Sequence, residues 1–274
     1  MFKYMSCLMI IFLLCGCAGL PGVKNIEVFD EGDFVAGGLQ DTINAAAYSR
    51  LPDYEKLTFE VRWLGLRIGT LTTSIMGIKN YNGRDVYILE AAMKTDDFFS
   101  KIYKIEDRFI SYMDVEKLYT LRHEVYRRDG KYKKDAITEF DQANHKAYFK
   151  NFIDNSEKAF DIPSGVHDIL SGSYYFRVLE LKLGGGVEYY VCNNESNYHF
   201  YGFVRSKATI KLPALAKEKR EAILLEPYAK LKGKKVDKGR VSAYFSADKR
   251  RLPLMAIVKG PIFTEVTISL VKIE

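Results

Sequence analysis

Three residues close together, His167, Asp168 and Ser171, have the side-chain types of a hydrolase triad. Such a triad works only when the histidine lies between the serine and the carboxylate, so geometry decides its identity rather than residue type. Asp168 and Ser171 fall at the start of a predicted helix, where Asp168 is well placed to cap free backbone N–H groups. No Gly-x-Ser-x-Gly segment occurs in the chain. The sequence therefore predicts helix capping here and no catalytic residues.

The four histidines, His123, His145, His167 and His199, are scattered along the chain, without a His-x-x-x-His pair. A protein metal site needs three or four converging ligands, and a Cys-x-x-Cys pair is also missing. Beyond the N-terminal segment the only cysteine is Cys192, which we expect to be an ordinary packed thiol. We therefore expect no metal, no disulfide, no cofactor and no enzymatic activity.

The N-terminus predicts a covalent modification. Lys3 precedes the apolar run 5–14, which is too short to span a bilayer and is typical of a signal peptide. The segment Leu14-Cys15-Gly16-Cys17 resembles a bacterial lipobox, in which Cys17 is acylated, with chains such as palmitate, and becomes the first residue. A plain signal peptide or a short anchor is the alternative. Acylated Cys17 attaches a soluble domain to a membrane, and Ala18 after it permits sorting to an outer membrane, facing the periplasm.

A moderate positive charge fits work near anionic lipid or cell-wall polymer. The formal net charge is +6, and it does not indicate nucleic acid. Four lysines around Gly233 predict a basic loop that faces anionic headgroups, each charge contributing about 1 kcal/mol near such a surface. They are Lys230, Lys232, Lys234 and Lys235. The alternative is an ordinary solvated loop.

Several aromatic residues are candidates to line a ligand cavity, since ligand pockets are mostly apolar with a few polar groups. They are Trp63, Tyr103, Tyr174, Tyr175, Phe176, Tyr189 and Tyr201. Asp107, Arg108, Asp168 and Arg177 are the candidate polar groups. The alternative is that the aromatic residues simply fill the interior, because a barrel of about eight strands is filled by its side chains, whereas more strands leave space.

One helix is predicted, from Ile169 to Lys182. Apolar residues three and four apart mark one face, and the three glycines 184–186 are suited to end the helix. Gly172 inside it predicts a close approach to a strand. This helix must position Asp168 and Arg177.

The rest of the chain predicts strands. Leu57, Phe59, Val61 and Trp63 alternate with polar residues, and similar short runs follow, separated by turns. Three of these turns are expected to be closed by an aspartate, since this side chain bonds the backbone two residues on. They contain Asp114, Asp141 and Asp248.

The expected architecture is all-β and mainly antiparallel. It is a closed or partly open barrel-like meander of about a dozen strands, with the helix packed as a lid or plug. The predicted divisions are a lipoprotein signal peptide over 1–16, a tether over 17–52 and a single barrel-like domain over 53–274.

The run from Phe59 to Leu71 resembles the opening of a bacterial exported family known as domain of unknown function 3108. Blocks at 104–108, 167–177 and 247–253 are also similar to it. The resemblance covers about residues 54–273 and implies a periplasmic protein or lipoprotein. The family has no agreed activity, so the resemblance gives no catalytic residues to carry over. A weaker, fold-level likeness to open-barrel carriers of lipids or lipoproteins adds one more expectation.

Three functions are compatible with the sequence. The first is a membrane-tethered lipoprotein whose barrel binds a hydrophobic or amphipathic envelope molecule, as a carrier or chaperone. The second is a structural or interaction protein of the envelope with a protein partner and no ligand. The third is a hydrolase of envelope glycan or lipid, which would need paired carboxylates such as Asp107 and Asp168.

Overall fold

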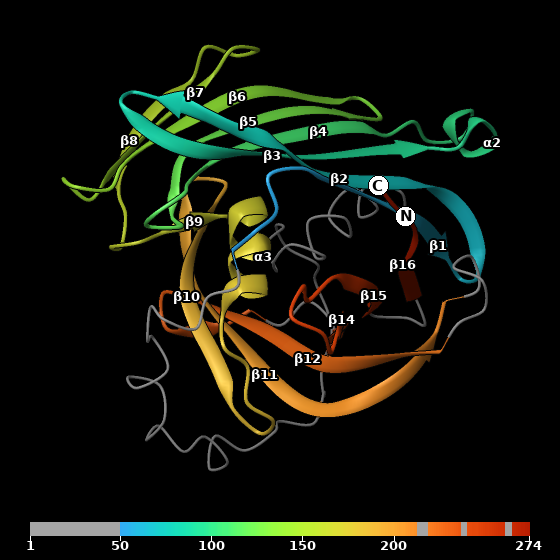
Figure 1. The fold of residues 1–274 in the computed structure, drawn as a ribbon. Coiled ribbons are helices and arrows are strands. Elements are labelled where there is room, and N and C mark those ends of the chain that lie inside the picture. Colours follow the sequence, from blue (N-terminus) through green and yellow to red (C-terminus); the bar gives the residue numbers. More distant parts are fainter. Residues whose placement is uncertain (1–49, 213–218, 237–239, 261–264) are drawn as a thin grey trace.

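The computed structural model describes residues 50–274, apart from 213–218, 237–239 and 261–264. Its strands form one 16-stranded, mainly antiparallel sheet (Figure 1). Nine strands precede the central helix: β1 (Glu55–Trp63), β2 (Leu66–Tyr81), β3 (Arg84–Thr95), β4 (Glu106–Asp114), β5 (Thr120–Asp129), β6 (Tyr132–Asp141), β7 (Lys146–Asn151), β8 (Glu157–Asp161) and β9 (His167–Asp168). Seven follow it: β10 (Gly186–Asn193), β11 (Ser196–Lys211), β12 (Lys219–Leu231), β13 (Lys234–Lys235), β14 (Arg240–Ser246), β15 (Pro253–Lys259) and β16 (Glu265–Ile273). The helices are α2 (Asp97–Ser100) and α3 (Ile169–Val178).

The first strand lies in the middle of the sheet. It pairs with β2 on one side and with β16 on the other, so Lys56 and Glu274 exchange two backbone hydrogen bonds of 2.9 Å. From β1 the sheet runs in sequence order to β8 in one direction and through β16, β15, β14, β12, β11 and β10 to β9 in the other. The sheet is open, and it curls around α3, with β2–β8 on one side of the helix and β10–β12 on the other (Figure 1).

This arrangement confirms the expected fold class of a mainly antiparallel, partly open barrel with a helix as plug. The aspartate turns are also confirmed, because Asp114 accepts from the N–H groups of Glu116 and Lys117, and Asp141 and Asp248 each accept from a backbone N–H within three residues. The strands are more numerous than expected, because β8, β9 and β13 are short and show no alternation in the sequence.

The helix packs inside the curled sheet, beside a separate apolar cluster that includes residues of β1, β2, β12 and β14–β16. Leu170, Tyr174 and Val178 pack with buried residues of β2–β4. Ile169 packs against β10 and β11, and Phe176 packs against β11 and β12. Eight of the ten residues of α3 are buried. The helix α3 is therefore a plug in contact with both halves of the sheet.

The helix ends earlier than the sequence predicted. It stops at Val178, and Leu179 is already extended, so the prediction of a helix to Lys182 was wrong. The glycines that were expected to end it serve the sheet instead, since Gly184 N–H donates to the Val204 carbonyl and Val204 N–H to the Gly185 carbonyl. The close approach at Gly172 is confirmed, because the Tyr189 hydroxyl donates to the Gly172 carbonyl at 2.9 Å.

Asp168 fastens the start of the helix to the sheet. Its fully buried carboxylate accepts from the backbone N–H groups of Leu170 and Ser171 at 2.7 and 3.1 Å, which is the predicted cap. The other oxygen accepts from the Thr120 hydroxyl of β5 at 2.8 Å and from the Ser111 hydroxyl of β4. Four donors from three separate segments thus converge on one carboxylate.

A buried ion pair holds the far end of the helix. The Arg177 guanidinium donates two hydrogen bonds, of 2.6 and 2.8 Å, to the Glu55 carboxylate at the start of β1. Both side chains are less than a tenth exposed. Paired, fork-like contacts of this kind fix orientation as well as position. The helix is therefore tied to the sheet at both ends.

We expect Asp168→Asn to lower the free energy of unfolding by about 3 kcal/mol. The amide nitrogen is a donor where donors already converge, so at least one buried hydroxyl or N–H loses its acceptor. Urea denaturation, followed by circular dichroism, measures this change. The matched control is Asp161→Asn, whose side chain is 84% exposed and paired only with Lys146, with an expected change below about 0.5 kcal/mol. Equal effects of the two substitutions would contradict the fastening role.

Candidate functional site

The triad-like residues do not form a catalytic arrangement. Ser171 is fully buried, its hydroxyl oxygen is 3.4 Å from His167 Nδ1, and it also lies 2.6 Å from the Thr120 hydroxyl. Asp168 bonds Thr120 and Ser111 rather than His167, so the histidine does not lie between the serine and the carboxylate. The Asp168 cluster is a closed structural network.

His167 is the most strongly perturbed histidine in this network. Its ring stacks on Tyr175 with centroids 4.4 Å apart and meets the edge of Tyr189 at 5.4 Å. Burial lowers its pKa from the usual 6.5 to about 4, although the charge of Asp168 opposes this shift. His167 is therefore a neutral packed ring at neutral pH.

The aromatic residues that were candidates for a cavity lie in different places. Tyr174 and Phe176 pack in separate clusters, while Tyr175 and Tyr189 meet each other beside His167. Trp63 and Tyr103 pack against the apolar cluster between β1, β2 and β16, and Tyr201 stacks on Tyr228. The structure brings these residues together in small groups at separate places, Tyr175 with Tyr189 for example, so a cavity lined by all seven stays a prediction.

The candidate polar groups are also dispersed. Asp107 accepts a hydrogen bond from Arg127 at 3.2 Å, in a buried group that includes Asp129. Burial raises the pKa of Asp107, although the positive charge of Arg127 opposes this shift. Arg108 is half exposed and bonds Glu90 at 2.8 Å. Arg177 bonds Glu55, and Asp168 caps the helix, as described above. These four groups do not share a site, which removes the geometric basis for pairing Asp107 with Asp168.

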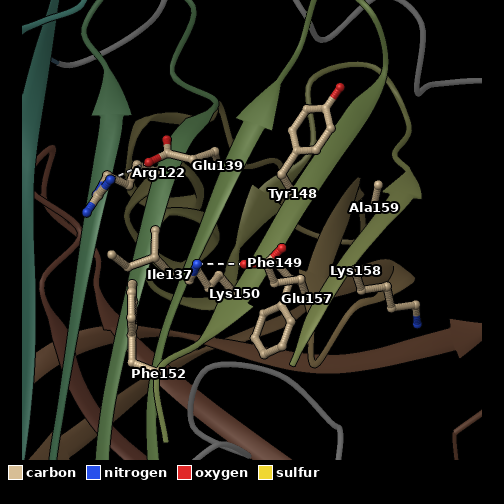
Figure 2. Close-up of a pocket in the computed structure, with 10 residues that line it drawn as sticks. All are labelled: Arg122, Ile137, Glu139, Tyr148, Phe149, Lys150, Phe152, Glu157, Lys158 and Ala159. Carbon is tan, nitrogen blue, oxygen red and sulfur yellow. Dashed lines mark hydrogen bonds and ion pairs between the residues drawn. The ribbon is translucent and has the colours of Figure 1, made fainter. Parts of the chain in front are cut away.

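A groove of about 540 Å³ lies over β5–β8 (Figure 2). Two rows of side chains cross these strands in register, Glu139 with Tyr148 and Ala159, and Ile137 with Lys150 and Glu157. Phe140 and Ala147, which alternate with them, pack into an apolar cluster with Cys192. The rows therefore face away from α3. The groove is lined by Arg122, Ile137, Glu139, Tyr148, Phe149, Lys150, Phe152, Glu157, Lys158 and Ala159.

The groove combines exposed aromatic surface with charge. Tyr148 and Phe152 are 52% and 50% exposed. Lys150 bonds Glu157 at 2.6 Å, and its ammonium lies 5.9 Å from the centre of the Phe152 ring. The Lys150–Glu157 ion pair therefore lies between the exposed rings of Tyr148 and Phe152 (Figure 2). Volume and lining are in the range of small-molecule sites, although the groove is wide open.

An ion-pair network supports the wall of the groove nearest the centre of the sheet. Arg122 donates to both Glu139 and Glu124, and Tyr81 donates to the second oxygen of Glu139 at 2.8 Å. Burial disfavours the charge of Arg122, but the hydrogen bond to Glu124 and the charge of Glu139 outweigh it and raise the Arg122 pKa. The guanidinium is therefore a permanent positive charge.

Sequence reasoning missed this groove because it missed β8. All five residues of β8 are polar or only partly buried, so the alternation that predicts strands is weak there. The one available signal was the alternation in 146–151, where Tyr148 and Lys150 fall on the face opposite Ala147 and Phe149.

Other predicted features can now be placed. Lys230 lies near the end of β12, Lys232 is in the following turn, and Lys234 and Lys235 form β13. Cys192 is a buried free thiol. The leader 1–16, the lipidation residue Cys17 and the tether as far as residue 49 lie outside the described residues. Leu51, at the end of the predicted tether, is 4% exposed and packs into the domain.

Neither a membrane-spanning helix nor a metal site occurs among the described residues. None of the helices there has the length and apolar character needed to cross a membrane. No group of three or more His, Cys, Asp and Glu side chains in that part of the chain is arranged to hold a metal ion.

The comparisons agree on family and fold. A family model described as a protein of unknown function, DUF3108, matches residues 58–267, which confirms the resemblance. No curated protein matches the sequence. A β-barrel-like protein of domain of unknown function DUF1849 from Brucella abortus has a similar structure, with a TM-score of 0.55, 7% identity, and coverage of 82% of this chain and 98% of that chain. This likeness shows the fold alone.

Two further structures match less closely. A candidate lipoprotein from Parabacteroides distasonis has a TM-score of 0.34 at 6% identity, covering 82% of this chain and 97% of that chain. A candidate exported protein with a YmcC-like fold from Bacteroides fragilis has a TM-score of 0.30 at 10% identity, covering 83% and 98%. At such scores neither adds to the structural argument.

We expect acid to destabilise the protein through His167. Its pKa of about 4 in the folded state lies below the unfolded value, so protonation favours unfolding. The stabilisation is complete above about pH 6.5 and is lost as the pH falls toward 4, and about 2 kcal/mol disappears between pH 7 and 5. Urea denaturation at these two pH values measures the loss. It should be smaller in His167→Phe, which keeps a ring against Tyr175 but has no group that takes up a proton.

The matched control is His145→Asn, which removes an exposed histidine. This variant should keep the pH dependence of the unmodified protein. If His167→Phe also keeps it, another group causes the acid sensitivity.

Proposed function

The chain belongs to the DUF3108 family of proteins of unknown function, and we propose that it is a membrane-anchored envelope lipoprotein that binds an amphipathic molecule without catalysis. The observation that carries the proposal is the groove over β5–β8, where Tyr148 and Phe152 expose apolar surface between charged groups. Exposed aromatic surface with a polar rim is typical of binding sites.

The packed position of α3 favours this external site. The helix α3 occupies the centre of the sheet and is tied to it through Asp168 and Arg177. A ligand inside would have to displace a packed helix and break buried charge-assisted hydrogen bonds, which cost several kcal/mol to lose. A ligand in the groove displaces only water and flexible side-chain ends.

The lining predicts the ligand's chemistry. A hydrocarbon chain can lie on Tyr148, Ile137 and Phe152, while an anionic headgroup can meet Lys158. Each carboxylate of the groove already has a cationic partner, because Glu139 bonds Arg122 and Glu157 bonds Lys150. An anionic amphiphile with a single chain is the class that fits best.

The envelope location is supported by the N-terminal segment. Its positive residue, short apolar run and lipobox-like end at Cys17 have the order of a lipoprotein leader. Attachment to an outer membrane, facing the periplasm, is part of this proposal. The burial of Ser171 and the lack of a triad geometry around it support a binding role over hydrolysis.

A protein partner is the second candidate, favoured by the position of β8 at the end of the sheet. An end strand can accept a strand from another chain. However, β8 is only five residues long and carries Glu157, Lys158 and Asp161, and short charged edges discourage such pairing. The small ligand is therefore the better supported of the two.

Native mass spectrometry of residues 18–274, gently purified from cells, tests the proposal. We expect an additional mass of a small amphiphile that disappears on denaturation. Residues 18–274 include every described residue, so the fold is kept. A bare polypeptide mass would instead favour the protein partner.

Titration with dodecyl phosphate below its critical micelle concentration locates the site. We expect Tyr148→Ala combined with Phe152→Ala to weaken binding about tenfold or more, since each truncation removes roughly 1 kcal/mol of apolar contact. The control is Phe98→Ala in α2, where an aromatic residue is 68% exposed far from the groove. Unchanged binding in the double variant would rule out the groove.

A further inference from the structure

A row of aromatic rings crosses the outer face of β10–β12. Tyr190 stacks on His199 with centroids 4.5 Å apart, and His199 contacts Tyr201 at 4.2 Å. Tyr201 stacks on Tyr228 at 4.8 Å with the ring planes only 8° apart, and Tyr228 stacks on Phe203 at 5.5 Å. Five rings from three strands thus form one continuous row.

This row is not part of the core. Neighbouring residues of opposite orientation, Tyr189, Phe200 and Ala229, are the ones that pack inward. The rings of the row are only partly buried, and Tyr190 is 39% exposed. Cross-strand aromatic pairs such as Tyr201 and Tyr228 stabilise a sheet, and a contiguous aromatic patch on its solvent side is also typical of an interaction site.

Lysines cover the same row. The Lys230 ammonium lies 5.3 Å from the centre of the Tyr201 ring, and the Lys235 ammonium lies 5.5 Å from that of Tyr228. Lys232 and Lys234 are exposed in the adjoining turn and strand. We call the five rings together with Lys230 and Lys235 the aromatic–lysine face.

The electrostatic balance of the face is positive. Of its two neighbouring carboxylates, Glu226 pairs with Arg205 at 2.8 Å, and Glu188, 3.2 Å from His199, is outnumbered by the lysines of the face and its adjoining turn. Burial lowers the pKa of His199, so its ring adds little charge at neutral pH. The lysines therefore set the sign of the surface, and the partner it fits is anionic.

We propose that the aromatic–lysine face docks on the anionic lipid surface of the membrane. The row presents amphipathic ring surface along one face of the sheet, and the Tyr201 hydroxyl lies 2.6 Å from His199 Nδ1 within that row. Tyrosine is enriched at membrane interfaces because its ring is amphipathic, and lysine can lay its apolar stem on the rings while its ammonium reaches phosphate. The two residue types are thus combined as an interfacial contact requires.

The predicted anchor makes this contact favourable even if it is weak. Cys17 precedes Arg50 by 33 residues, and a chain of that length reaches at most about 110 Å. A lipid on Cys17 would keep the domain within this distance of one membrane, and such tethering gives a second contact a high effective concentration. A face with low affinity in free solution can then hold the domain against the membrane.

Vesicle co-sedimentation of residues 18–274, which lack the anchor, tests the proposal. We expect binding to vesicles containing about 30% phosphatidylglycerol in phosphatidylcholine, and at least about tenfold weaker binding to phosphatidylcholine alone or in about 0.5 M salt. Lys234→Glu combined with Lys235→Glu should weaken binding to the anionic vesicles at least about tenfold. Both side chains are exposed, so the fold is not at risk.

The control and a second variant keep the result interpretable. Lys101→Glu combined with Lys104→Glu makes the same charge change at exposed positions near α2 and should leave binding within about twofold. Tyr190→Ser should weaken binding several-fold at unchanged charge. Equal losses in the two lysine pairs would show general charge attraction and would overturn the docking face, as would equal binding to both kinds of vesicle.

This inference shares with the proposed function only the location at a membrane. Vesicle binding is measured without any groove ligand, and the groove is tested without vesicles. A negative result in one experiment therefore does not affect the conclusion from the other.

Discussion

A buried carboxylate must have its oxygens satisfied by hydrogen bonds, and at Asp168 this requirement joins three parts of the chain. Its carboxylate oxygens accept hydrogen bonds from Ser111 on β4, from Thr120 on β5 and from the first turn of α3. An unpaired buried polar group costs about 1–3 kcal/mol. Each of these segments therefore stabilises the packed position of the others. An open sheet of this length needs such a link, since its two ends, β8 and β9, are not paired with each other.

The fastened helix decides where binding can occur. Because α3 packs against both halves of the sheet and Arg177 ties its far end to Glu55, the concave side next to the helix is occupied by the protein itself. The exposed aromatic residues of the groove and of the aromatic–lysine face lie on the outer side, over β5–β8 and over β10–β12. The fold thereby acts as a rigid frame that presents two separate external surfaces. One has the lining of a ligand groove and the other has the charge and rings of an interfacial contact.

Local chemistry in the sequence was enough to predict part of this. The aspartate turns at Asp114, Asp141 and Asp248 and the cap at Asp168 depend on bonds within three residues, so they can be derived without a structure. The helix end could not, because Gly184 and Gly185 bond Val204 in a distant strand, and this tertiary pairing overrides their capping preference.

The sites were harder to predict than the elements. Ser111 and Thr120 lie 57 and 48 residues before Asp168, and Glu55 lies 122 residues before Arg177, so no spacing pattern connects them. Tyr201 was grouped with interior residues because ring type does not reveal which face of a strand it occupies. A shift of one position reverses the two faces, and only the observed register places Tyr201 outward beside Tyr228.

Native-state hydrogen exchange of α3 tests the central claim most directly. If the helix is a fastened plug, the backbone amides from Tyr174 to Val178 should exchange only through global unfolding, at the rate of the buried strands β3 and β4. A helix that acts as a mobile lid would instead exchange far faster than β3 and β4, while those strands stay protected. That second result would contradict the account, because it would open the interior to a ligand and remove the reason to place binding on the outer faces.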